Sequence, residues 1–118
     1  MNINNFNWNV EIVPKITIFN EGIYLSVGSM ALLGEPKRVE LGLDTKNQLL
    51  AIKAATTGGF RVTKRYFSCK NAILNILNMF KVITTGNIKL QGAYDKELNI
   101  LIFNLSRYMS YQDFKEIK

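Results

Sequence analysis

The 118-residue sequence contains no histidine and only one cysteine, Cys69. Without histidine, the chain lacks the usual general base and the commonest metal ligand of proteins. One cysteine rules out an internal disulfide and a multi-cysteine zinc site, and Cys69 suits a small packing residue better than a nucleophile. The carboxylates Asp95 and Glu97 flank Lys96 in an expected turn and form no acid and base pair. We therefore predict that the protein is not an enzyme and uses neither a cofactor nor a metal ion.

Long apolar runs are missing as well. No run approaches the roughly 20 residues that a helix needs to cross a bilayer. The start of the sequence, residues 1–8, has neither the positive charge nor the continuous apolar run of a secretory signal. The remaining mixture, 47% hydrophobic and 20% charged, suits a single globular domain over residues 1–118. We expect a soluble, cytoplasmic protein without a membrane partner.

Acidic residues are absent from a long central stretch, residues 45–94. The same stretch carries eight basic residues, which are Lys46, Lys53, Arg61, Lys64, Arg65, Lys70, Lys81 and Lys89. The net charge of +6 at pH 7 therefore arises in the middle of the chain. A region with charge of one sign predicts a basic face for a polyanionic partner.

Alternating apolar residues around short polar connections predict three hairpins. Runs of β-branched, aliphatic and aromatic residues flank turns that contain Asn, Asp or Gly. The paired segments are 16–19 with 23–26, 39–43 with 49–54, and 86–94 with 98–105. Phe6, Trp8, Val10 and Ile12 also alternate, which predicts an additional first strand that ends before Pro14.

Two helices are expected between these strands. Residues 26–34 suit a short helix, with Ser26 or Ser29 as its N-cap and Gly34 in the left-handed position after its end. Apolar residues at spacings of three and four predict a longer amphipathic helix over residues 69–81. The longer helix is expected to lie with its apolar side on the core.

The expected order of elements occurs twice in the chain. A strand, a helix and a hairpin follow one another in residues 15–55 and again in residues 59–105, and residues 106–118 form a C-terminal helix or tail. Gly22-Ile23-Tyr24-Leu25-Ser26 and Gly59-Phe60-Arg61-Val62-Thr63 each lead into a helical stretch. Repeated units of this kind usually bury a shared core. The predicted fold is therefore α+β, with antiparallel hairpins forming a twisted sheet or small barrel from two β-α-β-β units and one main amphipathic helix.

Residues 22–54 carry a pattern found in a known family. The matching segments are Gly22-Ile23-Tyr24-Leu25, Leu33-Gly34, Arg38-Val39-Glu40-Leu41 and Leu50-Ala51-Ile52. This stretch resembles the DNA-binding domain of AbrB/MazE-type bacterial regulators, in which a short strand and a small helix ending in Leu-Gly precede a Val-rich hairpin. The resemblance implies a swapped-hairpin barrel, normally built by dimerisation, that binds duplex DNA through basic residues. Two such units in one chain would supply what those regulators assemble from two chains.

The second unit begins with a basic segment, residues 60–66, that follows the flexible connector Gly58-Gly59. No lysine followed by serine or threonine accompanies this glycine pair, so it does not form a phosphate-binding loop of the P-loop type. Read as a strand, the segment separates its basic side from its aromatic side, with Arg61, Thr63 and Arg65 on one face and Phe60, Val62 and Tyr66 on the other.

The basic segment and its neighbours combine cations, which bind phosphates, with aromatic rings, which stack on unpaired bases. The predicted nucleic-acid contacts are Arg61, Lys64, Arg65, Tyr66, Phe67, Lys70, Lys53 and Lys89. The leading hypothesis is a small regulator or single-strand binder of a bacterial mobile element or phage, active as a monomer or homodimer, on single-stranded or duplex DNA. The alternatives are a protein-interaction module, such as an inhibitor or adaptor, with an acidic protein partner, or a merely solvated basic strand.

Overall fold

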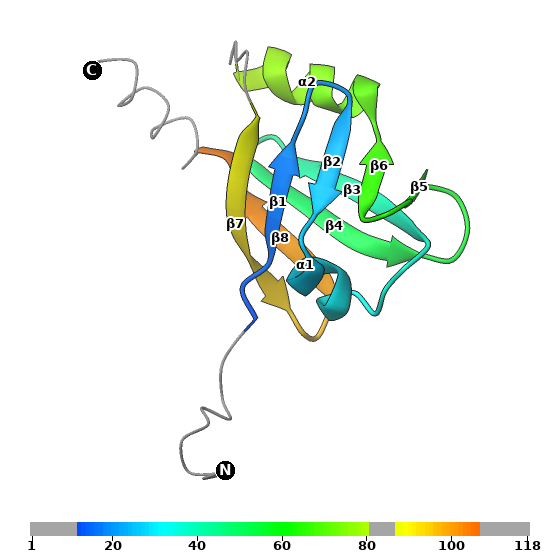
Figure 1. Ribbon diagram of the computed structural model, residues 1–118. Coiled ribbons are helices and arrows are strands. Elements are labelled where there is room, and N and C mark those ends of the chain that lie inside the picture. The colour runs from blue at the N-terminus through cyan, green and yellow to red at the C-terminus, as the bar shows by residue number, and fades with distance from the viewer. Residues whose placement is uncertain (1–11, 81–86, 107–118) are drawn as a thin grey trace, which may run out of the picture.

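The computed structural model of the protein describes residues 12–80 and 87–106. Eight strands are its main elements, and only one of its two helices is longer than two turns (Figure 1). The elements are β1 (Lys15–Ile18), β2 (Gly22–Leu25), α1 (Val27–Leu32), β3 (Arg38–Asp44), β4 (Leu49–Ala55), β5 (Phe60–Arg61), β6 (Tyr66–Ser68), α2 (Lys70–Phe80), β7 (Ile88–Asp95) and β8 (Ile100–Asn104).

The strands form one antiparallel sheet that closes almost completely on itself. Their order is β5-β3-β4-β8-β7-β1-β2-β6, and every neighbouring pair runs antiparallel. The two outermost strands meet at the turn that joins them, where Thr63, two residues after β5, forms a bridge with Tyr66 of β6. Of the two predicted forms, twisted sheet or small barrel, the structure is a nearly closed barrel. Closure of this kind leaves little of the sheet edge unpaired.

The order of elements repeats along the chain. A strand, a helix and two strands follow one another as β2-α1-β3-β4 and again as β6-α2-β7-β8. If β1, β2, β3 and β4 are exchanged with β5, β6, β7 and β8 in that order, every strand keeps equivalent neighbours in the sheet. This holds when the contact between β5 and β6 is counted as a neighbour pair. The strand that precedes α2 is β6, however, and not the predicted residues 59–63. Duplication of the sequence itself stays a prediction.

The three predicted hairpins are confirmed as β1-β2, β3-β4 and β7-β8. Both predicted helices are confirmed as well, and they lie at opposite ends of the barrel (Figure 1). Ser26 is the N-cap of α1, because its hydroxyl accepts a hydrogen bond from the N–H of Ser29. Gly34 follows α1 with a φ of 80°, the left-handed conformation that glycine adopts without strain.

The predicted basic strand over residues 60–66 is wrong. Its middle is a tight turn, in which the N–H groups of Thr63 and Tyr66 each donate to the carbonyl of the other. Lys64 and Arg65 have φ values of 51° and 67°, the pair of positive angles that a type I′ turn requires. Because such turns usually carry Asn-Gly, the sequence Lys64-Arg65 offered no turn signal.

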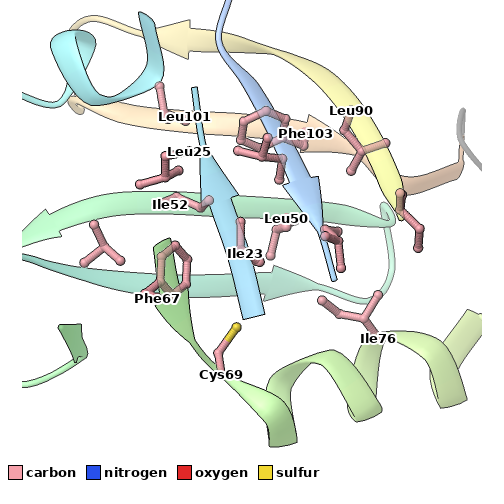
Figure 2. Packing of buried hydrophobic residues seen from close by; sticks show 14 of the residues in the cluster. Ile23, Leu25, Leu50, Ile52, Phe67, Cys69, Ile76, Leu90, Leu101 and Phe103 are labelled. Atoms are coloured by element: carbon pink, nitrogen blue, oxygen red, sulfur yellow. The ribbon is translucent and has the colours of Figure 1, made fainter. Parts of the chain in front are cut away.

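The core fills the barrel and extends beneath α2. Its largest fully buried side chains come from several different strands and include Ile23, Leu25, Leu50, Ile52, Phe67, Leu101 and Phe103 (Figure 2). Ile73 and Ile76 of α2 are buried as well, as the apolar spacing of this helix predicted. Each buried side chain of this size contributes about 1.5–3 kcal/mol through the hydrophobic effect.

Two predictions lie outside the described residues. One is the expected first strand, whose residues Phe6, Trp8 and Val10 lie outside the described ranges. The other is the C-terminal helix or tail. Ile12, the last member of that alternating pattern, is described and is 51% exposed. In residues 12–80 and 87–106, no helix is both long enough and apolar enough to cross a bilayer.

Candidate functional site

Four neighbouring strands present a row of side chains on the outer surface of the barrel. Thr17 of β1 lies directly opposite Lys89 of β7 and Tyr24 of β2, and Tyr24 lies opposite Tyr66 of β6. Opposed residues in antiparallel strands point to the same face of the sheet. Because the residues flanking them, such as Ile16 and Ile23, are buried, this row faces solvent. With strands about 4.8 Å apart, the row is about 14 Å long.

Three cations gather at one part of this row. Lys15, Arg65 and Lys89 line a hollow of about 520 Å³ together with Thr17, Tyr24 and Gln91, and we call this site the cationic hollow. β7, β1 and β2 run side by side at the front of the barrel in Figure 1. Residues of all three strands line this hollow. The hollow has the volume of a typical small-ligand site, for which about 300–1,000 Å³ is usual.

The three cations come from distant parts of the chain. Lys15 is on β1 and Lys89 on β7, with Lys15 opposite Gln91 in the pairing of these strands. Arg65 comes from the turn between Thr63 and Tyr66, and the carbonyl of Arg65 accepts a hydrogen bond from the N–H of Leu25. That bond ties the turn to β2. The turn therefore brings a third positive charge to a surface that β1 and β7 alone would supply with two.

Arg65 is held over an aromatic ring. Its guanidinium carbon is 4.8 Å from the centroid of the Tyr24 ring, which is a cation–π contact. Among the described residues that line the cationic hollow, none is acidic. The positive charges of Lys15, Arg65 and Lys89 consequently face one another without a carboxylate between them, which raises the local potential and favours an anionic ligand.

A second hollow adjoins the first across Tyr24, which lines both. It is formed by Phe19, Asn20, Glu21, Thr63, Lys64, Tyr66 and Asn87 as well as Tyr24, and we call it the aromatic hollow. Phe19 and Tyr66 meet edge to face, with ring centroids 6.3 Å apart. The two hollows together form one surface, with cations at one part and aromatic rings at the other.

Four of the eight predicted contact residues lie on this surface. Arg65 and Lys89 line the cationic hollow, and Lys64 and Tyr66 line the aromatic hollow. The prediction that Phe67 is available for stacking is corrected by the structure. Its side chain is only 1% exposed, and its ring stacks inside the protein on Phe60, with the centroids 5.8 Å apart. A nucleic-acid base cannot reach it.

The other three predicted contacts line neither hollow. Lys53 on β4 forms an ion pair with Glu40, with 3.3 Å between Nζ and Oε2. Arg61 on β5 lies opposite Arg38 of β3. Lys70 is exposed at the first position of α2. The basic residues of the central stretch therefore do not share one face, and Lys81 lies outside the described residues.

Sequence reasoning missed Lys15, Phe19 and Tyr24. The alternation of β1 is visible in its sequence and places Lys15 and Thr17 outside the core, and in β2 Tyr24 is partly exposed between the buried Ile23 and Leu25. What the sequence did not indicate is that β7 and β6 pair with the two sides of this hairpin. Without that pairing, Lys15 has no visible relationship to Lys89 or Arg65.

The described residues offer no sign of metal chemistry or of a reactive thiol. In residues 12–80 and 87–106, no three His, Cys, Asp or Glu side chains come together. Cys69 is only 3% exposed, and burial raises the pKa of its thiol to about 11. The thiol is therefore protonated at neutral pH, which suits the packing role.

Comparison with family models, curated proteins and solved structures finds no match to this chain. The resemblance of residues 22–54 to AbrB/MazE-type domains therefore stays a prediction.

Proposed function

We propose that the protein binds single-stranded nucleic acid without catalysing a reaction. The observation that carries the proposal is the convergence of Lys15, Arg65 and Lys89 around Tyr24, with no acidic residue among the described residues lining that hollow. Cations in this arrangement bind phosphates, and release of the counterions condensed on the nucleic acid provides much of the affinity. The strand phosphates would lie along the cationic hollow.

A single strand suits this surface better than a duplex does. Tyr24 and Tyr66 lie side by side in the row and are both partly exposed. Exposed aromatic rings on a sheet bind unpaired bases by stacking, at about 1–3 kcal/mol per base. In a duplex the bases are already stacked on one another, so the tyrosines would have no faces to contact. A role in a phage or mobile element and a homodimeric state are predictions from the sequence alone.

The proposal is tested by binding of a fluorescent single-stranded oligonucleotide and of its duplex at rising salt concentration. The variant Lys15→Gln with Lys89→Gln removes two charges from the cationic hollow. We expect weaker binding and a log–log salt slope that is smaller by about 0.7 for each phosphate that the protein no longer neutralises. The matched control is Lys46→Gln with Lys96→Gln, which removes the same charge from exposed turns outside both hollows.

Three outcomes would count against the proposal. Equal weakening by the two double variants would mean that only the net charge matters. No binding of either DNA at low salt would leave the alternative, an acidic protein that docks on the basic surface. Tighter binding of the duplex than of the single strand would contradict the assignment of Tyr24 and Tyr66 to base stacking.

A further inference from the structure

The aromatic hollow contains polar groups that the binding of phosphates does not need. Asn20 and Glu21 are in the turn between β1 and β2, and Asn87 immediately precedes β7. All three are exposed, and within residues 12–80 and 87–106 none of their side chains takes part in a hydrogen bond or an ion pair. These unpaired groups are available to a ligand.

The aromatic walls beside these groups pack on neighbouring parts of the barrel. The phenol end of Tyr66 occupies the space that a side chain at position 22 would need, so glycine there lets the ring lie across β2. Phe19 then meets this ring edge to face. A flat ligand has two aromatic side chains against which to pack, with amide and carboxylate groups nearby.

We propose that the aromatic hollow holds one unstacked base of the bound strand and prefers a base that carries an exocyclic amino group. This inference rests on the proposed binding of single-stranded nucleic acid. Glu21 is the one acidic residue among the described residues that line either hollow. A carboxylate accepts hydrogen bonds but donates none, so it suits the amino group of cytosine.

Thymine is the informative comparison with cytosine. It is also a pyrimidine and has a similar stacking surface, but it has a carbonyl oxygen where cytosine has its amino group. Such an oxygen would face the Glu21 carboxylate with no proton between them. The phosphates of the two strands are the same, so the cationic hollow does not distinguish them.

The test compares oligo(dC) with oligo(dT) of equal length at the same salt concentration. Wild-type protein is expected to bind oligo(dC) about fivefold more tightly or better, the ratio that a specific polar contact of about 1 kcal/mol provides. Glu21→Gln removes the charge while keeping the shape, and its amide can both donate and accept. We expect this variant to bind oligo(dT) more tightly and to lose the preference.

The controls separate a base contact from a general charge effect. Glu40→Gln removes one negative charge outside both hollows and should leave the preference unchanged. Phe19→Ala should weaken binding of oligo(dC) more than that of oligo(dT). Equal affinities of wild-type protein for the two strands would overturn the base site, as would an equal gain for both strands on Glu21→Gln. Salt-dependent binding with no base preference would overturn this inference alone, whereas no binding at all would overturn the proposed function.

Discussion

The guanidinium carbon of Arg65 is 4.8 Å from the centroid of the Tyr24 ring. The contact joins the turn between Thr63 and Tyr66 to the neighbouring strand β2. It also places a positive charge beside Lys15 and Lys89. One aromatic ring therefore both orients an arginine and contributes to the surface that we assign to nucleic acid.

Replacing Tyr24 separates these two roles. Tyr24→Phe keeps an aromatic face for Arg65, so we expect affinity for single-stranded DNA to stay within about twofold of wild type. Tyr24→Leu removes the ring and should weaken binding by about 1–3 kcal/mol, the range measured for one base stacked on an aromatic residue. Fluorescence anisotropy measures both affinities, and circular dichroism checks the fold. Equal affinities of the two variants would contradict a role for the ring.

The type I′ turn at Lys64 and Arg65 is predicted to lower the stability of the fold while it places Arg65 for binding. Lys64 and Arg65 both have positive φ, which costs a residue with a side chain about 1–2 kcal/mol. Lys64→Asn with Arg65→Gly introduces the usual type I′ sequence. We therefore expect the free energy of unfolding to rise by about 1 kcal/mol and DNA binding to weaken. Thermal unfolding and anisotropy measure the two effects. Lys64→Asn alone is the control, since it relieves part of the strain and keeps Arg65.

Ser29 connects α1 to the strand that carries Lys15. Its buried hydroxyl donates to the carbonyl of Lys15 at 2.8 Å and accepts from the N–H of the same residue at 2.9 Å. Ser29→Ala leaves both backbone groups without this partner, so we expect a loss of about 1–3 kcal/mol in the free energy of unfolding. Urea denaturation measures the loss, and the exposed Ser68→Ala should change stability by less than about 0.5 kcal/mol. Similar stabilities of the two variants would contradict this role of Ser29.

Cys69 is predicted to make the free energy of unfolding depend on pH in the alkaline range. Burial raises the pKa of this thiol from 9.0 to about 11 in the folded protein, so between these values the unfolded chain loses its proton while the folded chain keeps it. Stability from this group is therefore complete below pH 9 and falls as the pH rises toward 11. Cys69→Ala should show a shallower decline over that interval, measured by urea denaturation at several pH values. Parallel declines would show that Cys69 does not contribute.

Local sequence patterns predicted the hairpins and helices because each depends on residues close together in the chain. Ser26 provides the N-cap of α1, Gly34 takes the left-handed position after it, and the spacing of Ile73 and Ile76 defines the buried side of α2. The turn at Lys64-Arg65 escaped prediction because neither residue is typical of positive φ. Its conformation is instead accompanied by tertiary contacts, such as the hydrogen bond from Leu25 to the Arg65 carbonyl.

The excess of basic residues, the absence of histidine and the alternation that turns Lys15 outward can all be read from the amino-acid order alone. Which basic residues meet depends on the folded barrel. The pairing of β1 with β7 and of β2 with β6 assembles Lys15, Arg65 and Lys89, while Lys53 pairs with Glu40 on another part of the barrel. Side-chain alternation depends on neighbouring residues alone, whereas strand pairing depends on which apolar faces can share one core. The positions of the charged residues follow from that pairing.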